Sequence, residues 1–318
     1  MALWRCLMAI DYARLSAFTI ISIMLVAVQV PIVSSDSVDS QVQTYSVNGG
    51  RSILIEEYTA TWCPSCAEID PYLMEFAYAH GPRVAMVAYH PSDDVDAFQP
   101  LAAQNRIDRL LITHPEIGST PTFIVEAGPL RIGPDSWPDV NSDIFNEEVK
   151  RQSYTQLRLE IQQSNDTWTA TARVIDNDSI DEGQLTIMVV QHEKIVPEGF
   201  DNPGGLTRDR VLTAIAECDI NSSTITSEVN LLSAETTSCI DDFSVTFSPE
   251  NKVFSVLLIH EPSKSQLENG SSGTFGVVEY KSKNSPVTQS NVDNSLLIFA
   301  FVLIGSALIV NIRRKKRV

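Results

Sequence analysis

Basic residues are scarce in this sequence. Lys and Arg total 23 against 40 Asp and Glu, which gives a net charge of -17, and five of the bases lie within residues 313–317. A nucleic-acid-binding protein needs a basic face to contact phosphates, so this class is excluded. Hydrophobic residues make up 43% of the chain and charged residues 20%, which excludes wholesale disorder. A packed chain of 318 residues predicts two domains.

Two long hydrophobic runs lie near the ends of the chain. The first, residues 15–33, follows Arg5 and Arg14 and ends beside the small residues at 34–35, a pattern typical of a secretory signal. We therefore expect residues 1–35 to be a signal peptide. The run is also long enough for an uncleaved signal anchor, and this alternative stays open.

The second run, residues 295–312, has no polar face and is followed directly by the tail 313–318, in which residues 313–317 are all Arg or Lys. It predicts a transmembrane helix rather than a buried core helix. Because positively charged residues that flank a membrane helix stay on the cytoplasmic side, the tail 313–318 is expected in the cytoplasm and residues 36–294 outside it. Residues 282–294 are predicted to form a stalk, rich in Ser and Asn. The expected location is the cell membrane, crossed once.

Cysteine is also scarce, with five residues in the chain. Cys63 and Cys66 form a C-x-x-C sequence, whereas Cys218 and Cys239 lie 21 positions apart and flank a Ser- and Thr-rich segment. In an oxidising compartment this second pair is predicted to form a structural disulfide. No further Cys or His pair follows at a spacing typical of zinc sites, so no metal and no cofactor are predicted.

Residues 36–152 alternate between strand and helix patterns. A hydrophobic strand at 52–60 leads into the C-x-x-C sequence, and a helix with apolar residues at i, i+3, i+4 and i+7 follows and ends before Gly81. Further strands are expected at 84–89, 122–126 and 130–133, and further helices at 96–111 and 144–152. This alternation predicts an α/β domain.

The C-x-x-C pair lies where a strand passes into a helix. Cys63 would cap the helix and face solvent, where the helix dipole favours its thiolate. Cys66, one turn later, is close enough to form and break a disulfide with it. The arrangement predicts thiol–disulfide exchange in which Cys63 attacks and Cys66 resolves the mixed disulfide. The alternative is an inert structural disulfide.

Four features resemble the thioredoxin-like oxidoreductases. The sequence from Trp62 to Cys66 matches their W-C-x-x-C motif, and Glu57, Pro71 and the pair Thr120–Pro121 match their buried acid, helix-kinking proline and cis-proline loop. The resemblance covers residues 46–152. Two departures stand against it: Pro-Ser separates the cysteines where thioredoxins carry Gly-Pro, and the segment 91–119 is longer than in a minimal thioredoxin.

The resemblance implies a thioredoxin-like domain at 36–152 and a role for each matching residue. Trp62, Thr120 and Pro121 would contact the substrate chain, and Glu57 would exchange a proton with Cys66 beneath the disulfide. Because adjacent strand residues face opposite sides, Glu56 could point inward in place of Glu57. The spacing to the cysteines favours Glu57.

Histidines and an acidic cluster fall in the following loops. His90 and His114 are expected to be solvent-exposed loop residues, although either could place a positive charge near the thiolate. Asp93, Asp94 and Asp96 are expected to form a solvated turn that starts a helix rather than a cation site.

Residues 153–281 change to a period of two, which predicts an all-β, sandwich-like domain. Strands are expected at 157–162 and 168–174, joined as a hairpin, and at 184–191, 243–247 and 253–260. A thioredoxin-like domain followed by such a sandwich resembles the family of the 28-kilodalton outer-membrane protein.

These patterns predict an enzyme: a membrane-anchored, extracytoplasmic protein thiol–disulfide oxidoreductase. Its partners would be exported protein clients and a thiol or disulfide redox partner that resets the cysteine pair. The alternative is a cell-surface binding protein that uses the thioredoxin fold as a scaffold with a non-catalytic disulfide.

Overall fold

The computed structural model describes residues 42–175, 180 and 182–282. The expected signal segment 1–35, the transmembrane helix 295–312 and the tail 313–318 lie outside the described residues, as does the stalk apart from its first residue. Within the described part of the chain, no helix is long and apolar enough to cross a membrane.

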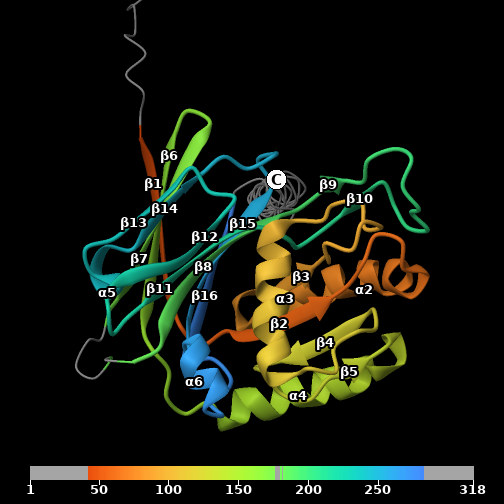
Figure 1. The fold of residues 1–318 in the computed structure, drawn as a ribbon, viewed down its shortest axis with the longest axis horizontal. Helices are drawn as coiled ribbons and strands as arrows, with labels where there is room; N and C mark the ends of the chain where they lie inside the picture. The colour runs from red at the N-terminus through yellow and green to blue at the C-terminus, as the bar shows by residue number, and fades with distance from the viewer. Residues whose placement is uncertain (1–41, 176–179, 181, 283–318) are drawn as a thin grey trace, which may run out of the picture. The chain divides into compact units, whose positions relative to one another are not determined.

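A nine-stranded mixed sheet runs through both halves of the described chain (Figure 1). Its order is β16-β15-β8-β11-β3-β2-β4-β5, with β12 paired to β11. The first half supplies β2 (Ile53–Tyr58), β3 (Val84–Tyr89), β4 (Thr122–Val125) and β5 (Arg131–Ile132). The second half supplies β8 (Gln184–Gln191), β11 (Val211–Asp219), β12 (Thr224–Val229), β15 (Phe254–Glu261) and β16 (Gly276–Lys281). β3 lies parallel to β2 and to β11, and the latter contact joins the two halves.

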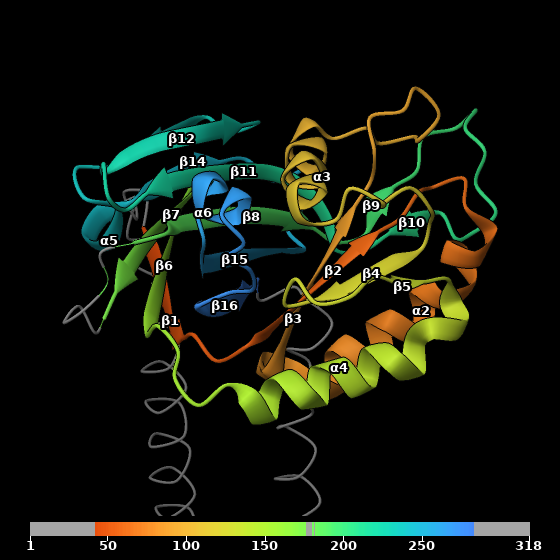
Figure 2. The same cartoon turned by 60° about the horizontal axis from the view of Figure 1, so that its bottom comes forward.

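Helices cover both faces of the first-half strands (Figure 2). They are α2 (Pro64–His80), α3 (Leu101–Thr113) and α4 (Trp137–Lys150), with short turns at η1 (Gly81–Arg83) and η2 (Pro134–Ser136). Side chains alternate along β2, so Ile53 and Ile55 pack in one hydrophobic cluster with α2 and α4. Leu54 belongs to the cluster on the opposite face, with α3. The register of β2 therefore decides which helix each of its side chains meets.

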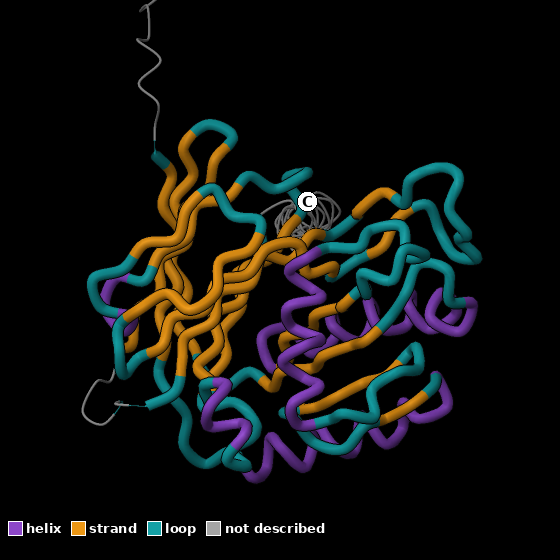
Figure 3. The backbone as a smooth tube through the Cα atoms, in the orientation of Figure 1, coloured by secondary structure: helices purple, strands orange, loops and turns teal. Residues whose placement is uncertain are grey.

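A five-stranded antiparallel sheet packs against the second-half part of the large sheet. Its order is β1 (Gln43–Gly49), β6 (Leu157–Ser164), β7 (Thr167–Val174), β14 (Ser244–Phe247) and β13 (Ser233–Glu235). One apolar cluster joins the two sheets and includes Leu159 and Trp168 from one and Val189 and Val256 from the other. Figure 3 shows that this half is mainly strand and loop, whereas the long helices belong to the first half.

The remaining elements connect these layers. They are β9 (Lys194–Ile195) and β10 (Thr207–Arg208), which pair as a small two-stranded sheet, and the short helices α5 (Cys239–Asp242) and α6 (Lys264–Glu268). Cys239 of α5 forms a disulfide with Cys218 of β11, at the pair of cysteines expected to be bonded.

Two expected helix boundaries were wrong. The helix expected at 96–111 begins at Leu101, because Pro100 precedes it and Gln99 has a φ of 42°, a conformation outside the helical range. The helix expected at 144–152 begins at Trp137 and ends at Lys150, with Pro138 in its first turn, where proline is favoured.

Strand pairings within the described residues cross the expected domain boundary at residue 152. β1 belongs to the range 36–152 but pairs along its whole length with β6 of the second half. The large sheet crosses the same division, and the described residues belong to one compact unit. The division into two folding domains stays a prediction.

Candidate redox site at the start of helix α2

The Cys63–Cys66 disulfide lies at the first turn of α2, with 5.3 Å between the two Cα atoms. Cys63 is the N-cap residue, with extended backbone angles, and its Sγ accepts the Cys66 backbone N–H at 3.1 Å. Pro64 occupies the first helical position, where its missing N–H costs no hydrogen bond. The Cys63 sulfur therefore lies at the positive end of the helix dipole, which favours its thiolate.

Both sulfur-bearing residues are buried. Cys63 is 2% exposed and Cys66 is fully buried, and they pack with Ala60 and Trp62. The expectation that Cys63 faces solvent was wrong. Sequence position alone placed it at a helix end, where side chains are usually accessible, but tertiary packing covers it.

The connection between β9 and β10, residues 196–206, packs against the start of α2. A Cβ atom added to Gly204 would lie 2.9 Å from the Cβ of Ala67, the residue that follows Cys66. Arg208 donates to the carbonyl of Thr61 at 3.3 Å and to Asn202 Oδ1 at 2.6 Å. Both views place this connection beside α2 (Figures 1 and 2). The second half of the chain thus contributes directly to the surroundings of the cysteine pair.

Glu56 and Glu57 are both buried, on opposite faces of β2. The Glu57 carboxylate, fully buried, lies on the face of α2, and its Oε2 is 3.2 Å from Arg210 Nη1. Glu56 lies on the face of α3, where it accepts from Arg106 at 2.7 Å and from the Tyr89 hydroxyl at 2.8 Å. The sequence analysis expected only one of these two glutamates to point into the protein. Both are buried because the sheet is covered on both faces.

Four charged side chains form a cluster on the α2 side. Asp70 lies 3.6 Å from Arg210 Nη2 and 3.5 Å from Arg208 Nε, and Arg210 also pairs with Glu57. Burial raises the pKa of Glu57 from 4.5 to about 7, although Arg210 opposes this rise. Burial likewise raises the pKa of Asp70, against the attraction of Arg210 and Arg208.

Only one member of this cluster has a local signal in the sequence. Asp70 follows Cys66 by four residues and so shares its helix face. Arg208 and Arg210 lie far along the chain, just before β11, in a segment that the sequence assigned no role. Only the parallel contact of β11 with β3 brings them under α2.

His90 directly follows β3 and is 1% exposed, so the expectation of an exposed loop histidine was wrong for this residue. Its Nδ1 lies 2.9 Å from Asp96 Oδ2, and the same oxygen accepts the Thr61 backbone N–H at 2.7 Å. Hydrogen bonds from His90 and Thr61 lower the pKa of Asp96 despite its burial. Asp96 is thus buried and ties His90 to the loop that leads into Cys63, rather than forming a solvated turn.

The predicted substrate-contact residues lie in two loops. Trp62 is partly buried against the cysteines. The Thr120–Pro121 peptide bond is cis, and the Pro121 carbonyl accepts the Gly133 backbone N–H at 2.8 Å. The cis geometry agrees with the loop expected from sequence. Contact of these residues with a substrate chain stays a prediction.

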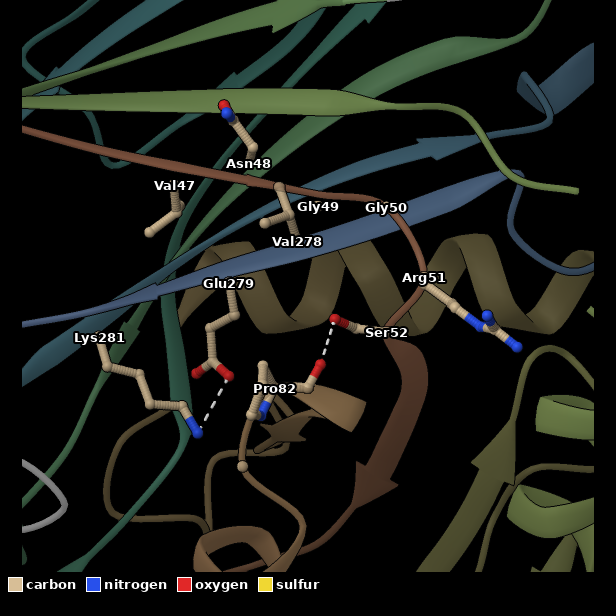
Figure 4. A pocket seen from close by; sticks show the side chains of 11 residues that line it. Val47, Asn48, Gly49, Gly50, Arg51, Ser52, Pro82, Val278, Glu279 and Lys281 are labelled. Atoms are coloured by element: carbon tan, nitrogen blue, oxygen red, sulfur yellow. Dashed lines mark hydrogen bonds and ion pairs between the residues drawn. The ribbon is translucent and has the colours of Figure 1, made fainter.

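A cleft of about 350 Å³ lies elsewhere (Figure 4). It is lined by residues 47–52, 81–82, 278–279 and 281, and its wall includes a bond from Ser52 Oγ to the Pro82 carbonyl at 2.7 Å. Ser52 directly precedes β2 and Pro82 follows the end of α2, whereas Cys63 follows β2 and precedes α2. The cleft is therefore at the far end of both elements, roughly 25 Å along α2. Within the described residues, no group of Cys, His, Asp or Glu could hold a metal ion.

Comparison with solved structures finds one that shares the fold of this chain. HBP35 of Porphyromonas gingivalis matches with a TM-score of 0.51 and 17% sequence identity, over 76% of this chain and 78% of that one. The chain has a thioredoxin-like fold with a C-x-x-C disulfide.

A second structure, protein AGR_C_4864 from Agrobacterium tumefaciens, matches with a TM-score of 0.45 and 11% identity over 71% of this chain and 92% of that one. No protein-family profile and no curated protein matches the chain. The resemblance to the 28-kilodalton outer-membrane protein family stays a prediction.

Proposed function

We propose that this protein is a thiol–disulfide oxidoreductase that acts on exported proteins. The observation that carries the proposal is the disulfide itself: Cys63 caps α2 in a thioredoxin-like fold, above a strand that carries the buried carboxyl of Glu57. The hydrophobic run 295–312 would anchor the enzyme in the membrane, with its described part outside the cytoplasm. Both the anchor and the exported clients are expectations from the sequence.

The reaction would begin with the reduced pair. The Cys63 thiolate attacks one sulfur of a client disulfide, forming a mixed disulfide and releasing the other client sulfur as a thiolate that takes up a proton. Cys66 then loses its proton to the Glu57 carboxylate and attacks the Cys63 sulfur. The Cys63–Cys66 bond forms as the bond to the client breaks. The client is reduced by two electrons, the pair is oxidised, and a dithiol partner would reduce it again.

Glu57 suits the transfer of this proton because burial raises its pKa to about 7, close to neutral pH. A base with such a pKa is partly ionised, and it can both accept and return a proton. An exposed glutamate, with its ordinary pKa, would be a weaker base.

A second function has an observation in its favour. Both cysteines are buried in the disulfide form, and Trp62 packs against them, so an external sulfur can reach Cys63 only if this packing opens. A binding protein with an inert disulfide would show this burial permanently. An oxidoreductase would expose Cys63 during turnover.

Insulin reduction with a dithiol donor separates the two functions. The full chain, purified in detergent, should accelerate insulin precipitation, and Cys63→Ser should abolish the acceleration. Cys66→Ser should retain the attacking thiol and accumulate a mixed disulfide with insulin, visible on a non-reducing gel. If the wild-type chain matches the donor alone and Cys66→Ser traps nothing, the scaffold function is correct.

A further inference from the structure

Arg210 comes from the second half of the chain and enters the redox site from below α2. It lies between β10 and β11 with a φ of 61°, and its carbonyl accepts the Ala88 backbone N–H at 2.8 Å. Ala88 is the register partner of Glu57 on the neighbouring strand. This backbone bond fixes Arg210 beside β3, and its side chain then reaches across to Glu57.

Each of the three guanidinium nitrogens of Arg210 has a different partner. Nη1 lies 3.2 Å from Glu57 Oε2, Nη2 lies 3.6 Å from Asp70 Oδ1, and Nε lies 3.2 Å from Met74 Sδ. Arg210 is 2% exposed. A planar side chain held at three points in a dry site has little freedom, so it fixes where the Glu57 carboxylate lies relative to α2.

The same contacts connect Glu57 with the helix face that carries the resolving cysteine. Cys66 and Asp70 are four residues apart on α2 and therefore lie on one face. Asp70 contacts Arg210, and Arg210 contacts Glu57. The cluster thus joins the acid on β2 to the first turns of α2.

We propose that Arg210 is a positioning residue that holds the Glu57 carboxylate for proton transfer with Cys66. The second half of the chain thereby controls the resolving step, although it contributes no reacting atom. The inference rests on the proposed oxidoreductase function. In that step Cys66 gives a proton to Glu57, its thiolate bonds to the Cys63 sulfur, and the client sulfur leaves with the electron pair and takes up a proton.

The charges around Glu57 determine the expected effect. Arg210 and Asp70 face it directly, and Arg208, His90 and Asp209 act on Asp70. The positive charge of Arg210 favours the ionised form of Glu57, so Arg210→Met should raise the pH at which Glu57 loses its proton. A nearby opposite charge typically shifts a pKa by about 1–3 units. The ionised fraction at pH 7 should then fall about fivefold or more.

The test measures the rate of mixed-disulfide resolution against pH in the full-length protein. Arg210→Met should slow resolution about fivefold or more at neutral pH, with the rate recovering at alkaline pH, and Arg210→Lys should restore part of the loss. Arg208→Met is the matched control, since it removes a buried positive charge from the same segment and from Asp70 but not from Glu57. Its pH midpoint should stay near the wild-type value.

A second measurement does not depend on turnover. The carboxyl of Glu57, followed by carbon NMR in the reduced protein, should titrate at a higher pH in Arg210→Met than in wild type. In the Glu57→Gln background, Arg210→Met should cause no further change in the pH profile of resolution. This double variant also removes both charges together, which protects the fold from an unpaired buried acid.

The outcomes separate the two proposals. In the first outcome, the wild type does not catalyse exchange but Arg210→Met still shifts the Glu57 titration. The oxidoreductase function then fails, and the positioning role of Arg210 is overturned with it. The contact of Arg210 with Glu57 would be electrostatic alone. If the wild type is active and neither the titration nor the midpoint moves in Arg210→Met, only the role of Arg210 is overturned. Equal shifts in Arg208→Met and Arg210→Met would also overturn it.

Discussion

Replacing Glu57 with Gln should change how the free energy of unfolding depends on pH. Burial raises the pKa of this carboxyl from 4.5 to about 7 in the folded protein, whereas the unfolded chain should ionise it near its ordinary value. Between these two pH values the folded state holds a proton that the unfolded state has released. Folding stability must therefore fall as the pH rises through this window.

The size of the effect follows from the two pKa values. They differ by about 2.5 units, and each unit corresponds to about 1.36 kcal/mol, so the folded state loses about 3 kcal/mol relative to its stability at low pH. Gln at position 57 cannot titrate. The stability of Glu57→Gln minus that of wild type should thus increase by about 3 kcal/mol between about pH 4 and about pH 8.

Chemical denaturation of the oxidised protein at a series of pH values measures this difference. Glu56→Gln is the matched control on the opposite face of the same strand. It removes a partner of Arg106 but keeps Glu57, so it should retain the wild-type decline with pH. If the stabilities of Glu57→Gln and wild type run parallel over the whole range, Glu57 has an ordinary pKa and the argument for it as a proton acceptor near neutral pH is refuted.

Three further predictions concern the cysteines and a second buried charge cluster. In the reduced protein Cys63 should alkylate before Cys66, and both should react at least about tenfold more slowly than in denaturant because they are buried; peptide mapping in which Cys66 reacts first would reverse the assigned roles. Cys239→Ser should lower the free energy of unfolding by about 3 kcal/mol, since its disulfide closes a loop in the unfolded chain, and unchanged denaturation would show that the loop is not constrained. Arg106→Met should cost about 3–5 kcal/mol because it removes the guanidinium partner of the buried Glu56 carboxylate, whereas Arg83→Met should change stability little, since Arg83 is largely exposed in its ion pair with Glu148; equal effects would contradict the burial argument.

Much of the site was predictable because its signals are local in sequence. The cap at Cys63 follows from a strand that passes into a helix with Pro64 at its first position, and the cis bond at Pro121 lies in the loop expected from sequence. Apolar runs and alternating apolar residues predicted strands in both halves, but β1 and β11 were not among them. These features depend on neighbours within a few residues, so the chain sequence alone carries them.

Two expectations of solvent exposure were wrong because contacts formed in the folded protein cover the residue. His90 follows a strand in a polar segment, which indicates an exposed loop, but Asp96 folds back and buries it. The exposure expected for Cys63 failed for a similar reason, because Ala60, Cys66 and Trp62 pack against it. Neither packing contact can be inferred from the spacing of the residues involved.

The sequence by itself determined the C-x-x-C pair, its place at a helix start, and the acid three positions before the end of the expected strand 52–60. Only the tertiary structure decided what surrounds them. The parallel contact of β11 with β3 places Arg210 beside Glu57, and no local pattern predicts it, because the pairing of distant strands depends on the apolar faces that the whole sheet must bury. The charge environment of Glu57 is therefore a property of the assembled sheet.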